Sequence, residues 1–157
     1  MAVLGISIGT RRNGIAVIRA GQLEAAKMHS LVDRWSPHKS KAILATYDKY
    51  VQRYSVRTIV VKTPKASHFT LAIKQLIREL NAYVLKQGCL IEYKTIEHIK
   101  AAEPSIKNRN KIFHLVVEKY PLLSRELRME TKNKHPYYYM KMFEAVIVAH
   151  LHIRDHE

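Results

Sequence analysis

Short apolar runs separated by glycine-containing turns limit the folds open to this chain more than any other feature. Leu4–Ile8 and Gly14–Ile18 are two runs of strand length, and a third extended segment, Leu23–Leu31, follows the turn at Ala20 and Gly21. Runs of this length joined by such turns are typical of antiparallel strands. We therefore predict that the chain begins with a meander of three antiparallel strands.

The segment after the meander predicts a helix and then a buried strand. Ser36 and Pro37 form a helix start, with Ser as the N-cap and Pro in the first helical position, and the helix should extend to Tyr54. Thr58–Val61 is a continuous β-branched run, as in a strand that is buried on both faces.

The rest of the chain continues the alternation of strands and helices. We predict a helix capped by Ser67 and ending before Gly88, a strand over Cys89–Tyr93, and helices over Thr95–Ala101, Ser105–Tyr120 and Met140–Ile153. Ser124–His135 is polar without a clear period and is predicted to be a loop. This order predicts a single α/β domain over residues 1–157, with a mixed sheet covered by helices.

Composition indicates the class of partner. The chain contains 27 Lys and Arg residues against 13 Asp and Glu, which gives a formal net charge of +14. Such an excess favours polyanions, with nucleic acid first and acidic membranes or proteins second. The single cysteine, Cys89, excludes an internal disulfide. No stretch approaches the roughly 20 apolar residues that span a bilayer, so we expect a cytoplasmic protein with no membrane partner.

The first strand and the segment after it resemble a known family. Leu4–Val17 is similar to the opening of RuvC-type Holliday-junction resolvases and their YqgF relatives, whose pattern is Gly-Ile-Asp-x-Gly-[Ser/Thr]-x-x-x-Gly-x-[Ala/Gly]-Val. Thr58–Val61, Leu90–Lys94 and Met142–His150 follow in the family's order. The resemblance implies a ribonuclease-H-like fold, in which the antiparallel meander is followed by parallel strands and helices cover both faces of the sheet. It also implies a homodimer.

The resemblance further implies a metal site that this chain has lost. In the family, four carboxylates clamp two metal ions that promote phosphodiester hydrolysis. At the corresponding positions this chain has Ser7, Lys62, Lys141 and Glu144, so only one carboxylate remains. An ammonium group cannot ligate a cation and repels it. We therefore expect no metal ion, no cofactor and a degenerate endonuclease rather than an active enzyme.

The substituted residues suggest what the site does instead. Two lysines and one glutamate leave one positive charge in excess without any metal. We predict that Lys62 and Lys141 replace the metal ions electrostatically, with Glu144 bridging them. Such a site holds a phosphate but does not readily activate water.

Basic residues near this site and at helix starts are predicted to contact nucleic acid, because helix N-termini already favour phosphate. A basic run beside tyrosines before the last helix can follow a backbone and stack bases. The predicted contacts are Arg11, Arg12, Lys39, Lys41, Lys62, Lys65, Lys107, Arg109, Lys111, Lys134, Tyr137 and Lys141. A histidine metal site is not expected, since His150 and His152 are two residues apart and do not share a helix face.

The function that these observations favour is binding of nucleic acid, namely DNA including branched DNA, without nuclease activity. One alternative is an active nuclease that uses Mg²⁺ or Mn²⁺ with Glu144 and with other acids, such as Asp48, Glu79 or Glu92. Another alternative is a protein-interaction scaffold whose basic face binds an acidic partner. Binding measured across a salt series separates the first function from the last.

Overall fold

A five-stranded mixed sheet lies at the centre of the protein, in the order β3-β2-β1-β4-β5. The computed structural model describes residues 1–132 and 138–156. β1 pairs antiparallel with β2 and parallel with β4, and β5 extends the parallel part. These pairings confirm the predicted ribonuclease-H-like sheet. The strands are β1 (Val3–Ser7), β2 (Arg12–Arg19), β3 (Gln22–Ser30), β4 (Thr58–Lys62) and β5 (Leu90–Lys94).

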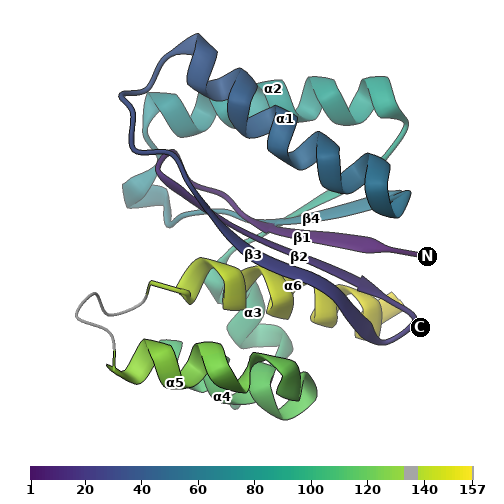
Figure 1. The fold of residues 1–157 in the computed structure, drawn as a ribbon, viewed down its shortest axis with the longest axis vertical. Coiled ribbons are helices and arrows are strands. Elements are labelled where there is room, and N and C mark those ends of the chain that lie inside the picture. The colour runs from purple at the N-terminus through teal and green to yellow at the C-terminus, as the bar shows by residue number, and fades with distance from the viewer. Residues whose placement is uncertain (133–137, 157) are drawn as a thin grey trace.

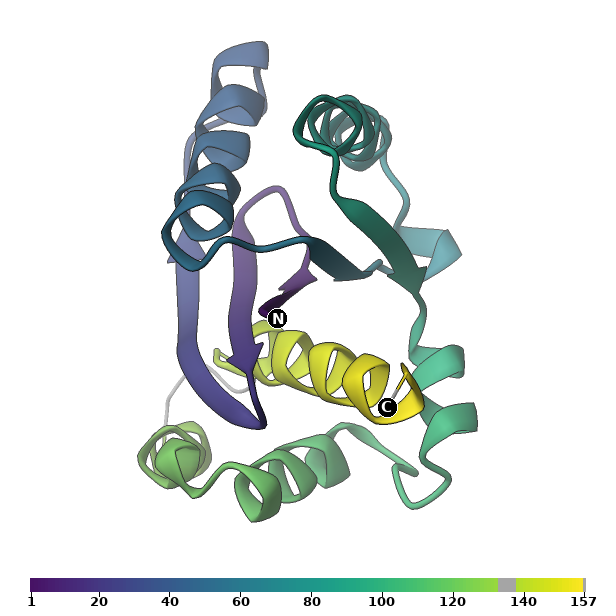
Figure 2. The same cartoon turned by 90° about the vertical axis from the view of Figure 1, so that its right-hand side faces the viewer.

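Helices cover both faces of the sheet, as predicted (Figures 1 and 2). α1 (Pro37–Tyr54) and α2 (Leu71–Gln87) lie on one face, and α6 (Met140–His156) lies on the other. α3 (Ile96–Ala102) and α4 (Arg109–Lys119) pack against α6, and α5 (Ser124–Lys132) packs against α4. Short 3₁₀ turns, η1 (Ala66–His68) and η2 (Pro121–Leu123), precede α2 and α5. Within the described ranges, none of the helices has the length and apolar character needed to cross a bilayer.

Alternation along the strands divides the core into two layers. Leu4 and Ile6 of β1 belong to the cluster beneath α1 and α2, whereas Val3 belongs to the cluster around α6. Because side chains alternate between the faces of a strand, Gly5 and Ser7 also face α6. The end of β1 therefore presents Ser7 to the helix that carries the remaining candidate residues.

α6 approaches the sheet closely because glycine lies beneath it at two positions. A Cβ atom at Gly5 would lie 2.1 Å from the carbonyl oxygen of Ala145, and one at Gly14 would lie 1.9 Å from the carbonyl oxygen of Lys141. No side chain fits in these positions without moving the helix. The two glycines thus hold the first turns of α6 directly over β1 and β2.

The helix boundaries follow the predicted capping chemistry in part. The Ser36 side chain accepts a hydrogen bond from the backbone N–H of Lys39 at 3.1 Å, and Thr95 caps α3. Gly88 ends α2 with a left-handed φ of 70°, as predicted. These residues act within one helical turn, which is why the sequence identifies them.

The predicted cap of α2 and the predicted start of α4 are wrong because another capping residue follows in each case. Thr70, not Ser67, caps α2, since Ser67 lies within η1. Asn108, not Ser105, caps α4, and the Ser105 hydroxyl instead donates to the Glu103 carboxylate at 2.8 Å.

The prediction of a loop over Ser124–His135 is wrong for the part that the structure describes. Ser124–Lys132 forms α5, while residues 133–135 lie outside the described residues. Leu127 packs against the α6 core, and the Glu130 carboxylate accepts a hydrogen bond from the backbone N–H of Tyr139 at 2.7 Å. The segment is amphipathic with the helical period, but it is so polar on average that its composition favours a loop.

Candidate nucleic-acid-binding site

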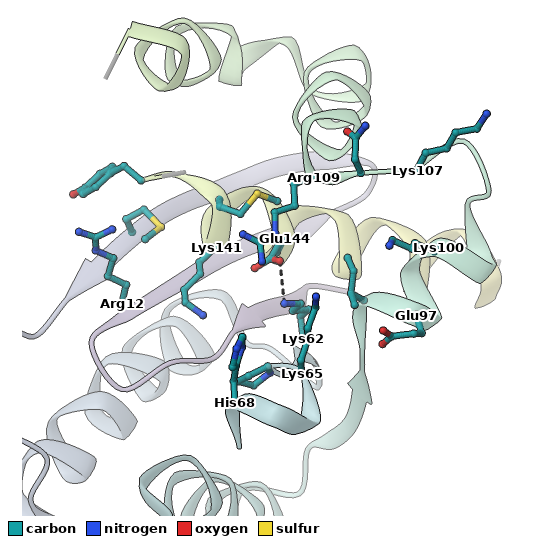
Figure 3. A pocket seen from close by; sticks show the side chains of 16 residues that line it. Arg12, Lys62, Lys65, His68, Glu97, Lys100, Lys107, Arg109, Lys141 and Glu144 are labelled. Atoms are coloured by element: carbon teal, nitrogen blue, oxygen red, sulfur yellow. Dashed lines mark ion pairs between the residues drawn. The ribbon is translucent and has the colours of Figure 1, made fainter. Parts of the chain in front are cut away.

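The sheet register brings four candidate residues to one edge. Ser7 is the last residue of β1 and lies opposite Lys62, the last residue of the parallel strand β4. α6 crosses this edge, and its residues Lys141 and Glu144 lie three positions apart and therefore on one face. Figure 3 shows the Lys62, Lys141 and Glu144 side chains converging there.

Both carboxylate oxygens of Glu144 have partners. The Ser7 hydroxyl donates to one oxygen at 2.9 Å, and the Lys62 ammonium lies 3.0 Å from the other (Figure 3). Glu144 is only 5% exposed, so these two contacts compensate a buried charge. The negative charge of the carboxylate is therefore balanced by the Lys62 ammonium.

Lys141 has a different partner from the predicted one. Its ammonium donates to the backbone carbonyl of Ile8 at 3.1 Å, so the predicted bridge from Glu144 to both lysines is wrong for Lys141. The cause is the path of α6, which lies on β1 and brings Lys141 to the backbone just beyond the strand. Burial lowers the pKa of Lys141; Glu144 opposes this shift, and the positive charges of Lys62 and Arg109 lower the pKa further.

The residues present do not fit the two divalent ions that the resemblance implies. Mg²⁺ prefers several carboxylate oxygens. Of the four family positions only Glu144 is a carboxylate, and it is occupied by Ser7 and Lys62, while Lys141 adds a second ammonium group at this end of the sheet. No catalytic step through metal ions follows from this arrangement.

Lys62, Lys141 and Glu144 open onto a basic cavity of about 480 Å³. Seven Lys or Arg side chains and two Glu side chains line it, an excess of five positive charges. The seven are Arg12, Lys62, Lys65, Lys100, Lys107, Arg109 and Lys141, and the two acids are Glu97 and Glu144 (Figure 3). A second cavity of about 570 Å³ shares Arg12 and Lys141 with the first and is also lined by Arg11.

Seven of the predicted contacts thus lie at two adjoining cavities, although they come from four separate parts of the sequence. They are Arg11, Arg12, Lys62, Lys65, Lys107, Arg109 and Lys141. The loops that follow the parallel strands and the start of α4 bring them together. Their role in binding stays a prediction.

Three predicted contacts lie elsewhere. Lys39 is buried, and its ammonium donates to the backbone carbonyl of Asp33 at 2.5 Å, so the prediction of a phosphate contact is wrong for this residue. A lysine near a helix start can turn toward the loop before the helix, which its sequence position does not reveal. Lys41 on α1 and Lys111 on α4 are exposed but line neither cavity.

The tyrosine segment before α6 contributes one lining residue. Tyr138 lines the cavity, and the Arg12 guanidinium lies 5.2 Å from the centre of its ring. This contact is within cation–π range and orders Arg12 at the rim. Lys134 and Tyr137 lie outside the described residues, so their predicted contacts stay predictions.

Two basic residues of the cavity are not among the predicted contacts, namely His68 of η1 and Lys100 of α3. Neither belongs to the family's motif, and the two lie 32 positions apart in the chain. Ile96 also lines the cavity, and Lys100 lies four positions after it on the same face of α3. The helical period of this segment could therefore have indicated Lys100.

A buried hydrogen-bond network holds the turn that carries the two arginines. The Asn13 side chain accepts a hydrogen bond from the backbone N–H of Gly9 at 3.1 Å and donates to the Gly9 carbonyl at 2.9 Å. The Tyr47 hydroxyl donates to the same Asn13 oxygen, and burial raises the pKa of Tyr47 so that the hydroxyl keeps its proton. The network fixes the turn between β1 and β2 from the α1 side.

The acids proposed for an active nuclease are elsewhere in the molecule. Asp48 of α1 accepts a hydrogen bond from the Tyr83 hydroxyl at 2.6 Å, and Glu92 pairs with Lys94 at 2.5 Å. Neither these two acids nor Glu79 lines the cavity. The described residues of the cavity offer no carboxylates other than Glu97 and Glu144.

Comparison with known proteins supports the fold. No sequence-family model and no curated protein sequence matches the chain. Thermus thermophilus RuvC in complex with a Holliday junction substrate is similar in structure, with a TM-score of 0.73 and 13% identity over 99% of this chain and 96% of that one. T. thermophilus RuvC in a second structure gives a TM-score of 0.68 and 14% identity over 99% and 97%. Fowlpox virus resolvase with a Holliday junction gives 0.60 and 9% over 99% and 98%.

Proposed function

We propose that the protein binds nucleic acid at the basic cavity, and that branched DNA is its preferred form. The observation that carries this proposal is the gathering of seven Lys or Arg side chains around one cavity at the edge of the sheet. Neutralising phosphates with such side chains releases counterions and drives association. Two structures of similar fold, those of T. thermophilus RuvC and fowlpox virus resolvase, contain a Holliday junction.

The same residues favour binding without hydrolysis. Lys62 and Lys141 place ammonium groups where phosphate oxygens would enter, and Glu144 is already paired. A general base must be within hydrogen-bond reach of the water that it activates. Both oxygens of Glu144 are engaged by Ser7 and Lys62, which disfavours Glu144 as that base.

Fluorescence anisotropy across a salt series tests the proposal. A four-way junction, its duplex arm and a single strand should all bind at low salt, the junction most tightly. The log–log slope for each phosphate contact should be near −0.9 on the duplex forms and near −0.7 on the single strand. Lys65→Glu and Lys107→Glu should each weaken binding and reduce the slope by about 1. Lys111→Glu is the matched control, because Lys111 is exposed near Lys107 in sequence but does not line the cavity.

Equal losses in the control and in the two cavity variants would contradict a defined site. Absence of binding to all three DNA forms at low salt would contradict nucleic acid as the partner and would favour an acidic protein. Self-association, which the family resemblance implies, stays a prediction that sedimentation of the free protein measures.

A further inference from the structure

The far end of α6 carries two histidines beside an acid. His152 and His156 lie four positions apart on the helix, and Glu92 of β5 faces them. The two imidazole rings stack with centroids 4.1 Å apart and an interplanar angle of 23°. One ligand atom of each of the three residues lies within 4.8 Å of those of the other two. This arrangement was not predicted, because only His150 and His152 were weighed as a pair and the partner of His152 lies one turn further along the helix.

The hydrogen bonds of both rings leave the same nitrogen free to ligate. Nδ1 of His156 lies 2.8 Å from the carbonyl oxygen of His152, and a carbonyl only accepts, so this nitrogen carries the proton. Nδ1 of His152 lies 2.7 Å from the Glu92 carboxylate and is the donor for the same reason. In the neutral form, both rings therefore keep the lone pair on Nε2.

Metal-binding histidines have hydrogen-bond partners of the same two kinds. A ligating histidine donates its other ring N–H to a carboxylate or a backbone carbonyl, which fixes its tautomer and orientation. His152 donates to a carboxylate and His156 to a carbonyl. Both imidazoles are thus prepared on one helix face without any metal present.

The neighbouring residues define the composition of the site. A small cavity of about 30 Å³ is lined by all three residues and by Lys94 and His98. The Nδ1 atom of His98 accepts a hydrogen bond from the backbone N–H of Thr95 at 3.0 Å, as part of the cap of α3. His98 is therefore not counted among the metal ligands. Lys94 lies 2.5 Å from the Glu92 carboxylate and competes with any cation there.

We propose that His152 and His156 bind a divalent transition metal ion through their Nε2 atoms, with Glu92 as the hydrogen-bond partner that orients His152 and with Zn²⁺ as the ion that suits imidazole ligands. Glu92 keeps His152 in place by accepting its Nδ1–H, on the side of the ring away from Nε2. Water completes the coordination shell, since the site lies at the surface and His156 is exposed. The ion joins the edge strand β5 to the end of α6, the helix whose first turns carry Lys141 and Glu144.

Isothermal titration of metal-free full-length protein with ZnCl₂ tests the site. The protein should bind one equivalent, with a rise in Tm. His156→Ala and Glu92→Gln should each raise the Kd for Zn²⁺ by about tenfold or more. Lys94→Gln should lower the Kd, because it removes the competing ammonium. His114→Ala, at an exposed position of α4, is the matched control and should leave the Kd unchanged.

A measurement on the unmodified protein guards against variants that fail to fold. Long-range ¹⁵N–¹H spectra should show His152 and His156 protonated on Nδ1, and Zn²⁺ should shift the Nε2 signals of these two residues. The proposal is overturned if Zn²⁺ shifts other histidines only, if no Zn²⁺ binds, or if His156→Ala and His114→Ala bind Zn²⁺ equally well.

Discussion

Glu144 and Lys62 form a buried ion pair in the α6 layer, with side chains only 6% and 12% exposed. Burying two charges carries a large desolvation penalty, which their attraction offsets only while both partners and the Ser7 hydroxyl are present. Removing either residue therefore leaves the other charge buried without a counter-charge. The contribution of the pair is seen most clearly when one partner is removed.

Glu144→Ala should lower the free energy of unfolding by about 3–5 kcal/mol, because it leaves the Lys62 ammonium buried without a counter-charge. Urea denaturation followed by circular dichroism measures the change. Asp155→Asn is the control, since Asp155 pairs with Arg154 at the surface and its loss should lower the free energy by less than about 1 kcal/mol. An equally small loss in Glu144→Ala would show that Lys62 reaches solvent.

Lys141 should make nucleic-acid binding depend on pH. Burial lowers its pKa below the ordinary value of 10.5, so the ammonium loses its proton at a lower pH than an exposed lysine does. Below the lowered pKa the cavity has this charge, and above it the charge is lost, so affinity should fall as pH rises toward 10.5. Lys141→Arg keeps the charge and should give a flatter profile by anisotropy. Identical profiles would contradict a role for Lys141 in binding phosphate.

At the scale of elements, the seating of α6 on β1 and β2 decides where the site residues lie. Gly5 and Gly14 permit contact between the helix backbone and the sheet. Lys141 and Glu144 therefore reach the ends of β1 and β4 with little freedom. A shift of α6 would separate both from their partners.

Gly14→Ala tests this seating. Its Cβ would lie 1.9 Å from the Lys141 carbonyl oxygen, so α6 must move, and the free energy of unfolding should fall by about 1–3 kcal/mol or more. Junction affinity should fall as well, because Lys141 moves with the helix. Gly21→Asn is the control, since Gly21 has open space around it and asparagine tolerates a left-handed φ. If Gly14→Ala kept both its stability and its affinity, α6 would be shown to accommodate a Cβ atom at position 14, and this account of its seating would be contradicted.

The sequence predicts elements whose signals are local or strongly apolar. The β-branched run at Thr58–Val61 and the Ser36 cap identify β4 and α1 because burial and capping act on those residues directly. α5 was not predicted, because a polar helix of 9 residues depends on contacts such as that between Glu130 and Tyr139. Such contacts arise only once distant segments have met.

The position of the candidate site was predictable, but its hydrogen bonds and ion pairs were not. The resemblance places Ser7, Lys62, Lys141 and Glu144 at corresponding strand and helix positions, and the structure brings them together. That Lys141 donates to a backbone carbonyl depends on side-chain direction, which spacing does not determine. The same holds for Lys39, which turns into the protein.

At the scale of the whole molecule, the formal net charge of +14 draws any polyanion toward the protein. The two cavities that share Arg12 and Lys141 focus this charge at one edge of the sheet. A metal-dependent resolvase needs acids at this edge, whereas this chain has ammonium groups there. We therefore predict that the protein binds junctions without cleaving them.

Affinity for a four-way junction, measured in EDTA and again in millimolar Mg²⁺ or Mn²⁺ with the strands analysed afterwards, tests the central claim most directly. We predict binding in EDTA at least as tight as with metal, since Lys62 and Lys141 need no ion to hold phosphate, and we predict intact strands throughout. Binding that requires the metal, or cleavage that disappears in Glu144→Ala, would contradict this account.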